Sequence, residues 1–541
     1  AMKHRLDAPS VDIGAGLGGV AAARTAARLG CRVVLTEADT WLGGQMTVQG
    51  VPPDETPWIE DLPTSASYAE LRSLIRDHYR QFYPLTPRAH SDVELNPGGG
   101  DVSRLCHEPR VSALVLEQMI SPLVASGRIV WLREHEPVEV VRSEDSVEQI
   151  TVCDLVTGEE TDLRAPTFVD ATELGDVLEL GSIEHVIGAE SQEEYGELHA
   201  PKKADPNDQQ AITWCCAVEW RKGNADFVDR PALYERFSTV VPEFWPGPQL
   251  SWQDIEPVSL STRTRAMLAG DSSGTPPGRS GDLWHYRRIV SRSNLSPEFP
   301  GGEITLVNWP QIDYWDKPLL GVSQESRRQA EDESRQLTLS FVHWLQTVAP
   351  RHDGGYGYPE LRLRGDVFGT KDGLARQPYY RESRRIRALD TVTEGDIGIE
   401  MRGQHSGSAT VRDTVGTGYY RIDLHPTPAG RSYVDIGCFP FQIPLGALIS
   451  RDAGNLLAGA KNIGTTHITN GAYRVHPVEW SIGVAVGALA QMCHEHGVEP
   501  ATVRSDDGML RELQAMLTEK LGAQLAWPER IRTLAEGVAL W

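Results

Sequence analysis

The pattern of apolar and polar positions over the first forty residues predicts a strand, a helix and a second strand, in that order. Val11 and Ile13 give a short first strand that is only weakly apolar, and the alanine-rich stretch 17–29 predicts a helix that ends at Gly30. Residues 31–36 predict a second apolar strand, with Glu37 at its carboxyl end. This order is typical of a parallel βαβ unit, so the chain is expected to begin with an α/β sheet domain.

The pattern continues less regularly as far as residue 182. Residues 52–100 are polar and rich in proline, with one amphipathic helix, and the apolar runs that follow have the lengths of helices and strands. The last two strands before residue 153 are separated by polar turns and predict an antiparallel meander. The predicted elements are helices over 68–83 and 109–123 and strands over 129–132, 137–141, 149–152 and 166–172.

A change in composition divides the rest of the chain. Residues 183–449 are rich in tryptophan and proline and less periodic, as expected for a substrate-covering domain inserted into another domain. An apolar strand returns at 455–460, followed by a helix over 477–492 with proline in its first turn. Leucines at helical spacing over 509–525 predict a packing helix. The predicted domains are 1–182 (with an insert at about 52–105) with 450–500, the α+β substrate or cap domain 183–449, and the helical segment 501–541.

The first βαβ unit carries a glycine fingerprint. Gly14 permits the tight turn after the strand, Gly16 lets backbone N–H groups approach a pyrophosphate, and Gly19 lets the helix pack closely on the sheet. A carboxylate at position 37 can accept hydrogen bonds from the two hydroxyls of an adenosine ribose. These features predict a dinucleotide site.

Composition and charge exclude several other classes. The 541 residues carry 52 basic and 75 acidic side chains, a net charge of −23, which argues against nucleic acid as a partner. The seven cysteines form no CxxC or CxxxxC spacing, so no structural zinc site or dithiol centre is expected. No stretch of 18 apolar residues occurs, and no signal peptide is recognised. We expect a soluble, cytoplasmic protein without membrane insertion.

Three separated motifs resemble those of the FAD-dependent oxidoreductase family, whose members share a glutathione-reductase-type flavin domain and are related to fumarate reductase and aspartate oxidase flavoproteins. The resemblance implies FAD as the cofactor and an α/β fold with a discontinuous Rossmann-like FAD-binding domain. The motifs are Gly14–Gly19 with Glu37 and Gly43-Gly44-Gln45, Val169–Asp176, and Gly459–Trp480, with a further match at Tyr379–Arg385.

The resemblance also implies roles at matching positions. The fingerprint glycines would hold the pyrophosphate, residues 43–45 would pass beside the flavin, Val138 would contact adenine through its backbone, and the helix beginning near Pro477 would direct its N-terminus at the flavin N1 and O2 edge. Residues 45–49 contain no histidine or cysteine where covalent relatives attach the flavin, so FAD is expected to be non-covalent. The implied FAD contacts are Gly14, Gly16, Gly19, Glu37, Gly43, Gly44, Gln45, Val138, Ala171, Thr172, Glu173, Asn462, Trp480 and Gly483.

Catalytic candidates come from segments expected near the flavin. His467 and His476 are the side chains best suited to accept a proton near neutral pH, the alternatives being a satisfied buried histidine and a helix cap. Arg474 could bind a substrate carboxylate or pair with Glu479. Arg384, in a basic cluster with its neighbours, could form an anion site or a solvated surface.

The leading functional hypothesis is a dehydrogenase or oxidase that removes a hydride from a small organic substrate. No second GxGxxG unit appears, which disfavours a separate NAD(P)H domain. The alternatives are a flavin-dependent monooxygenase that uses NAD(P)H, a non-redox isomerase or lyase, an electron-transfer subunit, and a plain NAD-binding protein. The substrate, the electron acceptor (O₂ or another carrier) and the oligomeric state are left open by the sequence.

Overall fold

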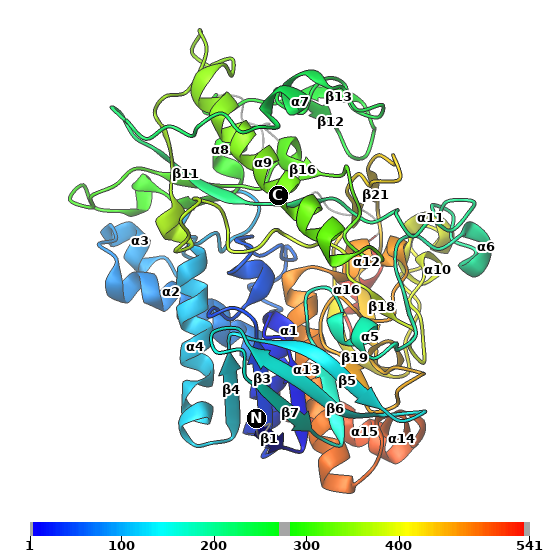
Figure 1. Cartoon of the computed structure of the whole chain (residues 1–541). Helices are drawn as coiled ribbons and strands as arrows, with labels where there is room; N and C mark the ends of the chain where they lie inside the picture. Colours follow the sequence, from blue (N-terminus) through cyan, green and yellow to red (C-terminus); the bar gives the residue numbers. More distant parts are fainter. Residues whose placement is uncertain (1–3, 270–281, 535–541) are drawn as a thin grey trace.

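A five-stranded parallel sheet forms the base of the molecule. The computed structural model describes residues 4–269 and 282–534. The sheet has the strand order β23-β8-β2-β3-β4, so its first and last strands along the chain are separated by more than 400 residues (Figure 1). Its strands are β2 (Ser10–Ile13), β3 (Val33–Glu37), β4 (Ile129–Arg133), β8 (Thr167–Asp170) and β23 (Leu456–Ala458).

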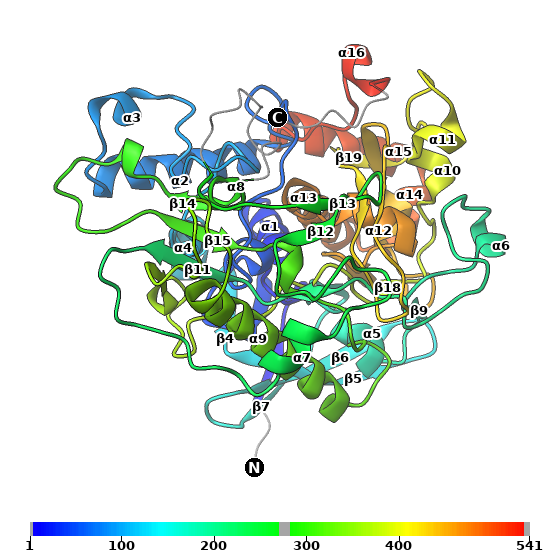
Figure 2. The same ribbon diagram turned by 90° about the horizontal axis from the view of Figure 1, so that it is seen from above.

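Two helices, α1 (Leu17–Arg28) and α13 (His476–His496), lie side by side against this sheet, at the centre of the molecule in Figure 2. Glycines bring their backbones close together. A Cβ on Gly483 would lie 2.2 Å from the Gly18 carbonyl oxygen, and one on Gly487 would lie 2.4 Å from the Ala22 carbonyl oxygen. Only glycine fits at such distances, so the helices are held at backbone contact.

A smaller sheet of order β1-β7-β6-β5 lies beside the first. The predicted antiparallel meander is confirmed, since β6 pairs antiparallel with both neighbours while β1 pairs parallel with β7. The ladder between β5 and β6 is irregular at Val138, between the paired residues Pro137 and Glu139. The strands are β1 (His4–Asp7), β5 (His135–Arg142), β6 (Val147–Asp154) and β7 (Glu160–Arg164).

The insert after β3 is helical. It contains α2 (Ala66–Phe82) and α3 (Pro87–Ser91), and α4 (Pro109–Ala125) returns the chain to β4. Buried Arg72 fixes α2 to the preceding loop, because its guanidinium pairs with both Glu55 and Glu60. The loop at residues 51–56 is thereby held against α2.

Residues of the middle of the chain build a separate hydrophobic core, in the upper half of Figure 1. Helix α9 (Gln324–Thr347) packs on a sheet of order β14-β15-β11-β17, and buried tryptophans and Phe341 fill the space between them. Cys215 and Cys216 are buried in this core and are free thiols. The four strands are β14 (Arg288–Val290), β15 (Ile304–Val307), β11 (Cys216–Trp220) and β17 (Leu361–Leu363).

Short elements connect these layers. Between residues 176 and 320 they are α5 (Asp176–Leu180), β9 (His185–Val186), α6 (Gln192–Tyr195), β10 (Ile212–Thr213), α7 (Tyr234–Thr239), β12 (Gln253–Ile255), β13 (Thr262–Thr264), α8 (Leu283–Tyr286) and β16 (Asp313–Tyr314). Later in the chain they are β18 (Arg385–Ile386), α10 (Glu394–Ile397), α11 (Ile399–Arg402), β19 (Thr414–Gly418), β20 (Ile422–Leu424), β21 (Val434–Ile436), β22 (Phe441–Pro444), α12 (His467–Tyr473), α14 (Pro500–Ser505) and α16 (Glu529–Arg532).

The C-terminal segment differs from the predicted single helix over 509–525. Helix α15 (Asp507–Ala515) passes into a π-helical turn, Met516–Lys520, and the chain then turns at Gly522, whose φ is +59°. Its leucines pack on the main core, as predicted. Residues 535–541 of the predicted segment lie outside the described residues. None of the described helices is long and apolar enough to cross a membrane.

Candidate functional site

The turn between β2 and α1 forms one wall of a narrow cradle, which we call the glycine cradle and define by Gly14, Gly16, Gly43 and Gly44. Gly14 has a φ of +92°, and a Cβ there would lie 2.5 Å from the carbonyl oxygen of Ala171. Gly43 and Gly44 form the opposite wall, and Gly43 N donates a hydrogen bond of 2.9 Å to Ala15 O. Glycine is therefore required on both walls, by positive φ at Gly14, Gly43 and Gly44 and by close approach at Gly16.

Glu37 lies at the end of β3, beside the first turn of α1. Its carboxylate accepts hydrogen bonds from Ala15 N at 3.0 Å and from Asp39 N at 2.8 Å. Burial raises the pKa of Glu37 to about 7, although these two bonds oppose the shift. The side chain is thus held where a ribose bound at the end of the first βαβ unit would meet it.

The floor of the glycine cradle, formed by Gln45, Glu173 and Glu479, holds buried hydrogen-bond acceptors without partners. In the described part of the chain, Glu173 Oε1, Glu479 Oε1 and Gln45 Oε1 are buried and accept no hydrogen bond. The carboxyl of Glu173 occupies the space between the walls, since a Cβ on Gly16 or Gly44 would lie 2.6 or 2.4 Å from its Oε1. Burial, followed by the charge of Glu173, raises the pKa of Glu479 to about 8.

These groups suit a dinucleotide that carries sugar and ribityl hydroxyls. Hydroxyls donate hydrogen bonds to the unpartnered acceptors, and the N-terminus of α1 offers backbone N–H groups and partial positive charge to a diphosphate. Lys461, whose Nζ lies 3.2 Å from Glu173 Oε2, brings a cation to the same floor. FAD therefore fits the residues present.

Of the remaining residues implied as FAD contacts, Thr172 and Asn462 follow strands β8 and β23 of the main sheet, and Trp480 and Gly483 lie in α13. Asn462 Nδ2 donates to Asp170 O at 2.9 Å and joins the carboxyl ends of β23 and β8, next to Thr172. Trp480 Nε1 donates to Ser67 Oγ at 2.9 Å, and Gly483 meets α1. Val138 lies at the irregularity of β5, where its backbone is out of register with β6.

A second space, which we call the arginine-rich cavity, opens between the middle of the chain and the C-terminal motif. Its volume is about 320 Å³, the size of a small-molecule pocket. Its lining is polar and aromatic, with guanidinium, carboxyl and phenol groups facing one another. The charged residues and histidine of the lining are Asp54, Glu55, Arg263, Arg265, Arg287, Asp313, Arg381, Arg421, Asp423, His425, Asp435 and Arg474.

Arg474 connects the glycine cradle with this cavity. Its backbone carbonyl accepts a hydrogen bond of 3.1 Å from Gln45 Nε2, while its guanidinium lines the cavity and donates to Tyr379 Oη at 2.8 Å. The guanidinium pairs with Asp423 at 3.2 Å rather than with Glu479, the partner considered in the sequence. Of the four predicted catalytic candidates, Arg474 alone is among the lining residues.

The other three candidates have structural partners. His476 accepts from Asp54 N at Nδ1 (3.1 Å) and bonds Val51 O through Nε2 (3.0 Å), and burial lowers its pKa far below the usual value. His467 is buried, with Nδ1 2.6 Å from Glu382 Oε1. Burial alone would lower the pKa of His467, but the neighbouring Glu382 carboxylate raises it above the usual value. Arg384 bonds Leu174 O and pairs with Glu179. His476 thus positions the loop that carries Asp54 into the cavity.

A histidine–carboxylate pair in the arginine-rich cavity was not among the residues predicted from the sequence. His425 Nδ1 lies 2.6 Å from Asp313 Oδ2, and Nε2 lies 3.6 Å from Asp423 Oδ2. Burial would raise the pKa of Asp313, but His425 and Arg381 lower it below its usual value. The available signal was the spacing of Asp423, in β20, and His425, directly after it, because alternate residues of an extended chain share a face.

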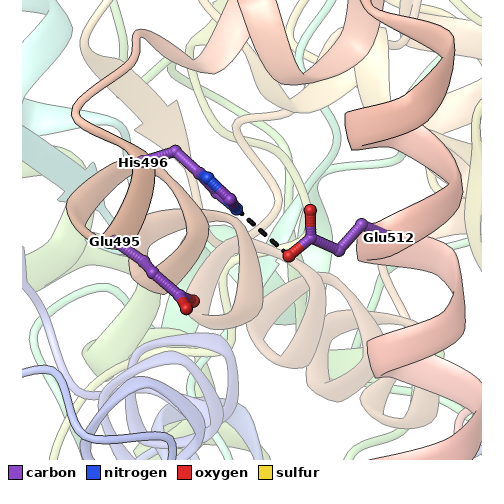
Figure 3. A group of neighbouring side chains, drawn as sticks. All are labelled: Glu495, His496 and Glu512. Carbon is purple, nitrogen blue, oxygen red and sulfur yellow. Dashed lines mark hydrogen bonds and ion pairs between the residues drawn. The ribbon is translucent and has the colours of Figure 1, made fainter.

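A surface group at the far end of α13 is separate from both spaces. Glu495, His496 and Glu512 are exposed, and Figure 3 shows His496 Nε2 directed at Glu512 Oε1, 3.1 Å away. Twenty residues of helix, about 30 Å, separate His476 at the site from His496. The group therefore takes no part in the chemistry of the cavity.

Comparisons with known proteins identify the family. A family model described as FAD dependent oxidoreductase matches residues 11–517, and no protein with a curated description matches the chain. One similar solved structure is L-proline dehydrogenase of P. horikoshii, with 15% identity, 35% of this chain and 25% of that chain covered, and a TM-score of 0.19. A second is E. coli quinol fumarate reductase FrdA, with 10% identity, 96% of this chain and 74% of that chain covered, and a TM-score of 0.32. A third is p-nitrophenol 4-monooxygenase PnpA of Pseudomonas putida, with 11% identity, 95% of this chain and 86% of that chain covered, and a TM-score of 0.33.

The matched region spans less than half of each of the first four solved structures. At these TM-scores the individual likenesses carry no argument about the reaction. The family model, in contrast, covers nearly all of the chain, and the glycine cradle fits the cofactor that the family description names. The chain belongs to the FAD-dependent oxidoreductase family and uses FAD as its cofactor.

Proposed function

We propose that the protein is a dehydrogenase or oxidase that removes a hydride from a small polar substrate bound in the arginine-rich cavity. The observation that carries the proposal is the double contact of Arg474, which bonds Gln45 of the glycine cradle through its carbonyl and lines the cavity with its side chain. A substrate held by this guanidinium lies beside the cofactor site. FAD, when bound, supplies the hydride acceptor.

We infer that residues 183–449 serve as the substrate-covering part of the molecule. Much of this region has its own hydrophobic core, and it contributes most of the cavity lining. Residues from the nucleotide-binding segments, Asp54 and Arg474 among them, complete the lining. The cavity is therefore lined by segments that are distant in sequence.

His425 is the side chain that we assign to the proton transfer. When Nδ1 donates its proton to Asp313, Nε2 is the ring atom that faces Asp423 and the cavity. Thr213 Oγ1 donates to the other oxygen of Asp313 at 2.7 Å and fixes that carboxylate. This arrangement orients the imidazole to take a proton from a substrate hydroxyl or amine.

Anaerobic mixing of the FAD-loaded enzyme with candidate substrates tests the proposal. The set comprises small alcohols, hydroxy acids and amines, and bleaching of the flavin near 450 nm (an approximate value for bound flavin) by one of them, with formation of the oxidised product, is the expected result. Bleaching by NADPH alone, with no organic substrate, would instead support a monooxygenase. Conversion of a substrate without any electron acceptor and without net oxidation would support a non-redox reaction.

A further inference from the structure

The unpartnered polar atoms of the arginine-rich cavity are almost all hydrogen-bond donors. Five lining residues carry a buried polar side-chain atom that has no hydrogen-bond partner among the described residues. Four of these atoms can only donate, and the fifth is a phenol oxygen. They are Arg265 Nε, Arg287 Nε, Trp309 Nε1, Arg474 Nε and Tyr433 Oη. Buried donors need partners, so the ligand of this cavity is rich in acceptor oxygens.

Most arginines of the cavity already have an acidic partner. Five lining guanidiniums lie within 4.0 Å of a carboxylate oxygen of the protein, and two of them share one carboxylate. The pairs are Arg263 and Arg265 with Asp254, Arg381 with Asp313, Arg421 with Asp435, and Arg474 with Asp423.

Arg287 is the exception. No carboxylate oxygen of the described residues lies within 4.0 Å of its guanidinium. The only hydrogen bond of its side chain in the described part of the chain runs from Nη1 to Asn308 O at 2.7 Å, and its Cζ lies 4.6 Å from the ring centroid of Tyr286. These contacts fix the plane of the guanidinium and leave Nε and Nη2 for a ligand.

Among the described residues, Arg287 is the lining arginine without a carboxylate at ion-pair distance, which favours a ligand with a single negative charge. A phosphate dianion would stand among the five carboxylates that line the cavity. A carboxylate carries one charge, and its two oxygens match the fork of Nε and Nη2.

We propose that the substrate is a small monocarboxylate, such as a hydroxy or amino acid, and that Arg287 binds its carboxylate group. The inference deepens the proposed function and rests on the arginine-rich cavity being the substrate site. Arg474 and Tyr433 then bond further oxygens of the same molecule, and Arg287 determines the preference for acids over neutral analogues.

Binding measurements on the FAD-loaded enzyme test this proposal without turnover. The probes are benzoate and 2-hydroxy-2-phenylacetate, each compared with its primary amide, and inorganic phosphate. The readouts are the flavin absorbance and the tryptophan fluorescence, since Trp309 lines the cavity. We expect each acid to bind at least 10-fold more tightly than its amide. Equal binding of acid and amide, or tighter binding of phosphate, would overturn the proposal.

Substitutions assign the preference to Arg287. Arg287→Gln is expected to reduce the ratio of the dissociation constants of amide and acid to near one. Arg287→Lys keeps the positive charge and is expected to preserve part of this ratio, so it controls for a folding defect. Arg362→Gln is the matched control, because Arg362 pairs with Asp226 outside the cavity, and it should bind as the wild type does. An unchanged ratio in Arg287→Gln would refute the role of Arg287.

The outcomes also separate this inference from the proposed function. Binding of acids that depends on Arg287, without bleaching of the flavin by any substrate, would retain the ligand class and reject dehydrogenation. Bleaching by a neutral substrate, with no preference for acids, would retain dehydrogenation and reject the carboxylate.

Discussion

Gln45 and Arg474, more than 400 residues apart in sequence, are joined by a hydrogen bond of 3.1 Å from the Gln45 amide to the Arg474 carbonyl. The same Gln45 nitrogen also donates to Glu479 Oε2 at 3.1 Å, so one side chain fixes the start of α13 to the glycine cradle. The position of the Arg474 guanidinium in the arginine-rich cavity consequently depends on the cofactor-binding segment.

His425→Gln should slow the reductive half-reaction. Glutamine cannot accept a proton, and loss of a general base costs about 10²-fold or more in rate. Stopped-flow measurement of anaerobic flavin reduction, under saturating substrate, gives the rate constant directly. His352→Gln serves as the control, because His352 stacks on Tyr358 outside the cavity. A wild-type rate of reduction in His425→Gln would exclude His425 as the base.

FAD should leave the protein on denaturation. The chain that passes beside the glycine cradle, residues 45–49, carries no histidine or cysteine that could form a bond to the flavin ring. Acid precipitation of the holoenzyme should release all of the yellow colour into the supernatant. Colour that stays with the washed pellet would contradict this prediction.

Glu37→Gln should weaken FAD binding by about 10-fold, equivalent to about 1.4 kcal/mol. The carboxylate accepts bonds from Ala15 N and Asp39 N, whereas an amide presents one N–H donor to one of these backbone donors. Titration of apoprotein with FAD, followed by flavin fluorescence, measures the dissociation constant. Glu117→Gln, on the surface near β4, should bind FAD normally. Equal affinities of the two variants for FAD would show that Glu37 does not contribute to FAD binding.

Gly483→Ala should destabilise the fold by about 3 kcal/mol, near the upper part of the usual range for overpacking. A methyl group there would lie 2.2 Å from the Gly18 carbonyl oxygen and would force α1 and α13 apart. Denaturant unfolding measures the change. In Gly395→Ala the new methyl group would meet only side chains at 3.6 Å or more, so this variant should match the wild type. A Gly483→Ala variant of wild-type stability would show that the helices can separate freely.

Asp12→Asn should stabilise the protein at alkaline pH. Burial in the central strand β2 raises the pKa of Asp12 from 3.8 to about 7, so the folded state holds a proton that the unfolded state releases. The unfolding free energy of the wild type therefore falls between about pH 4 and pH 7 through this group.

The asparagine variant lacks this titration. Its advantage should reach about 2 kcal/mol at pH 8 and shrink as the pH falls toward 5. Thermal unfolding across this range tests the expectation, with the exposed Asp77→Asn as the control. An advantage that does not change with pH would mean that Asp12 is not responsible.

Local patterns predicted the parts of the molecule that depend on neighbouring residues. The first βαβ unit, the end of α1 near Gly30, and the meander over β5 and β6 follow from periodicity and turn residues. The lining of the arginine-rich cavity could not be predicted in this way. Asp54, Arg287 and His425 come from three separate segments and become neighbours only when distant elements pack together. The π-helical turn after Ala515 likewise left no distinct signal in the leucine spacing.

The strand order of the main sheet constrains the timing of assembly. Strand β23 pairs with β8 at one edge of the sheet, and α13 must pack against α1 before the glycine cradle has its floor. A nascent chain has β23 once residue 458 has been made, but it lacks a complete α13 until residue 496. A complete FAD site therefore requires synthesis of the chain as far as α13, and a truncated chain ending before β23 would lack part of that site.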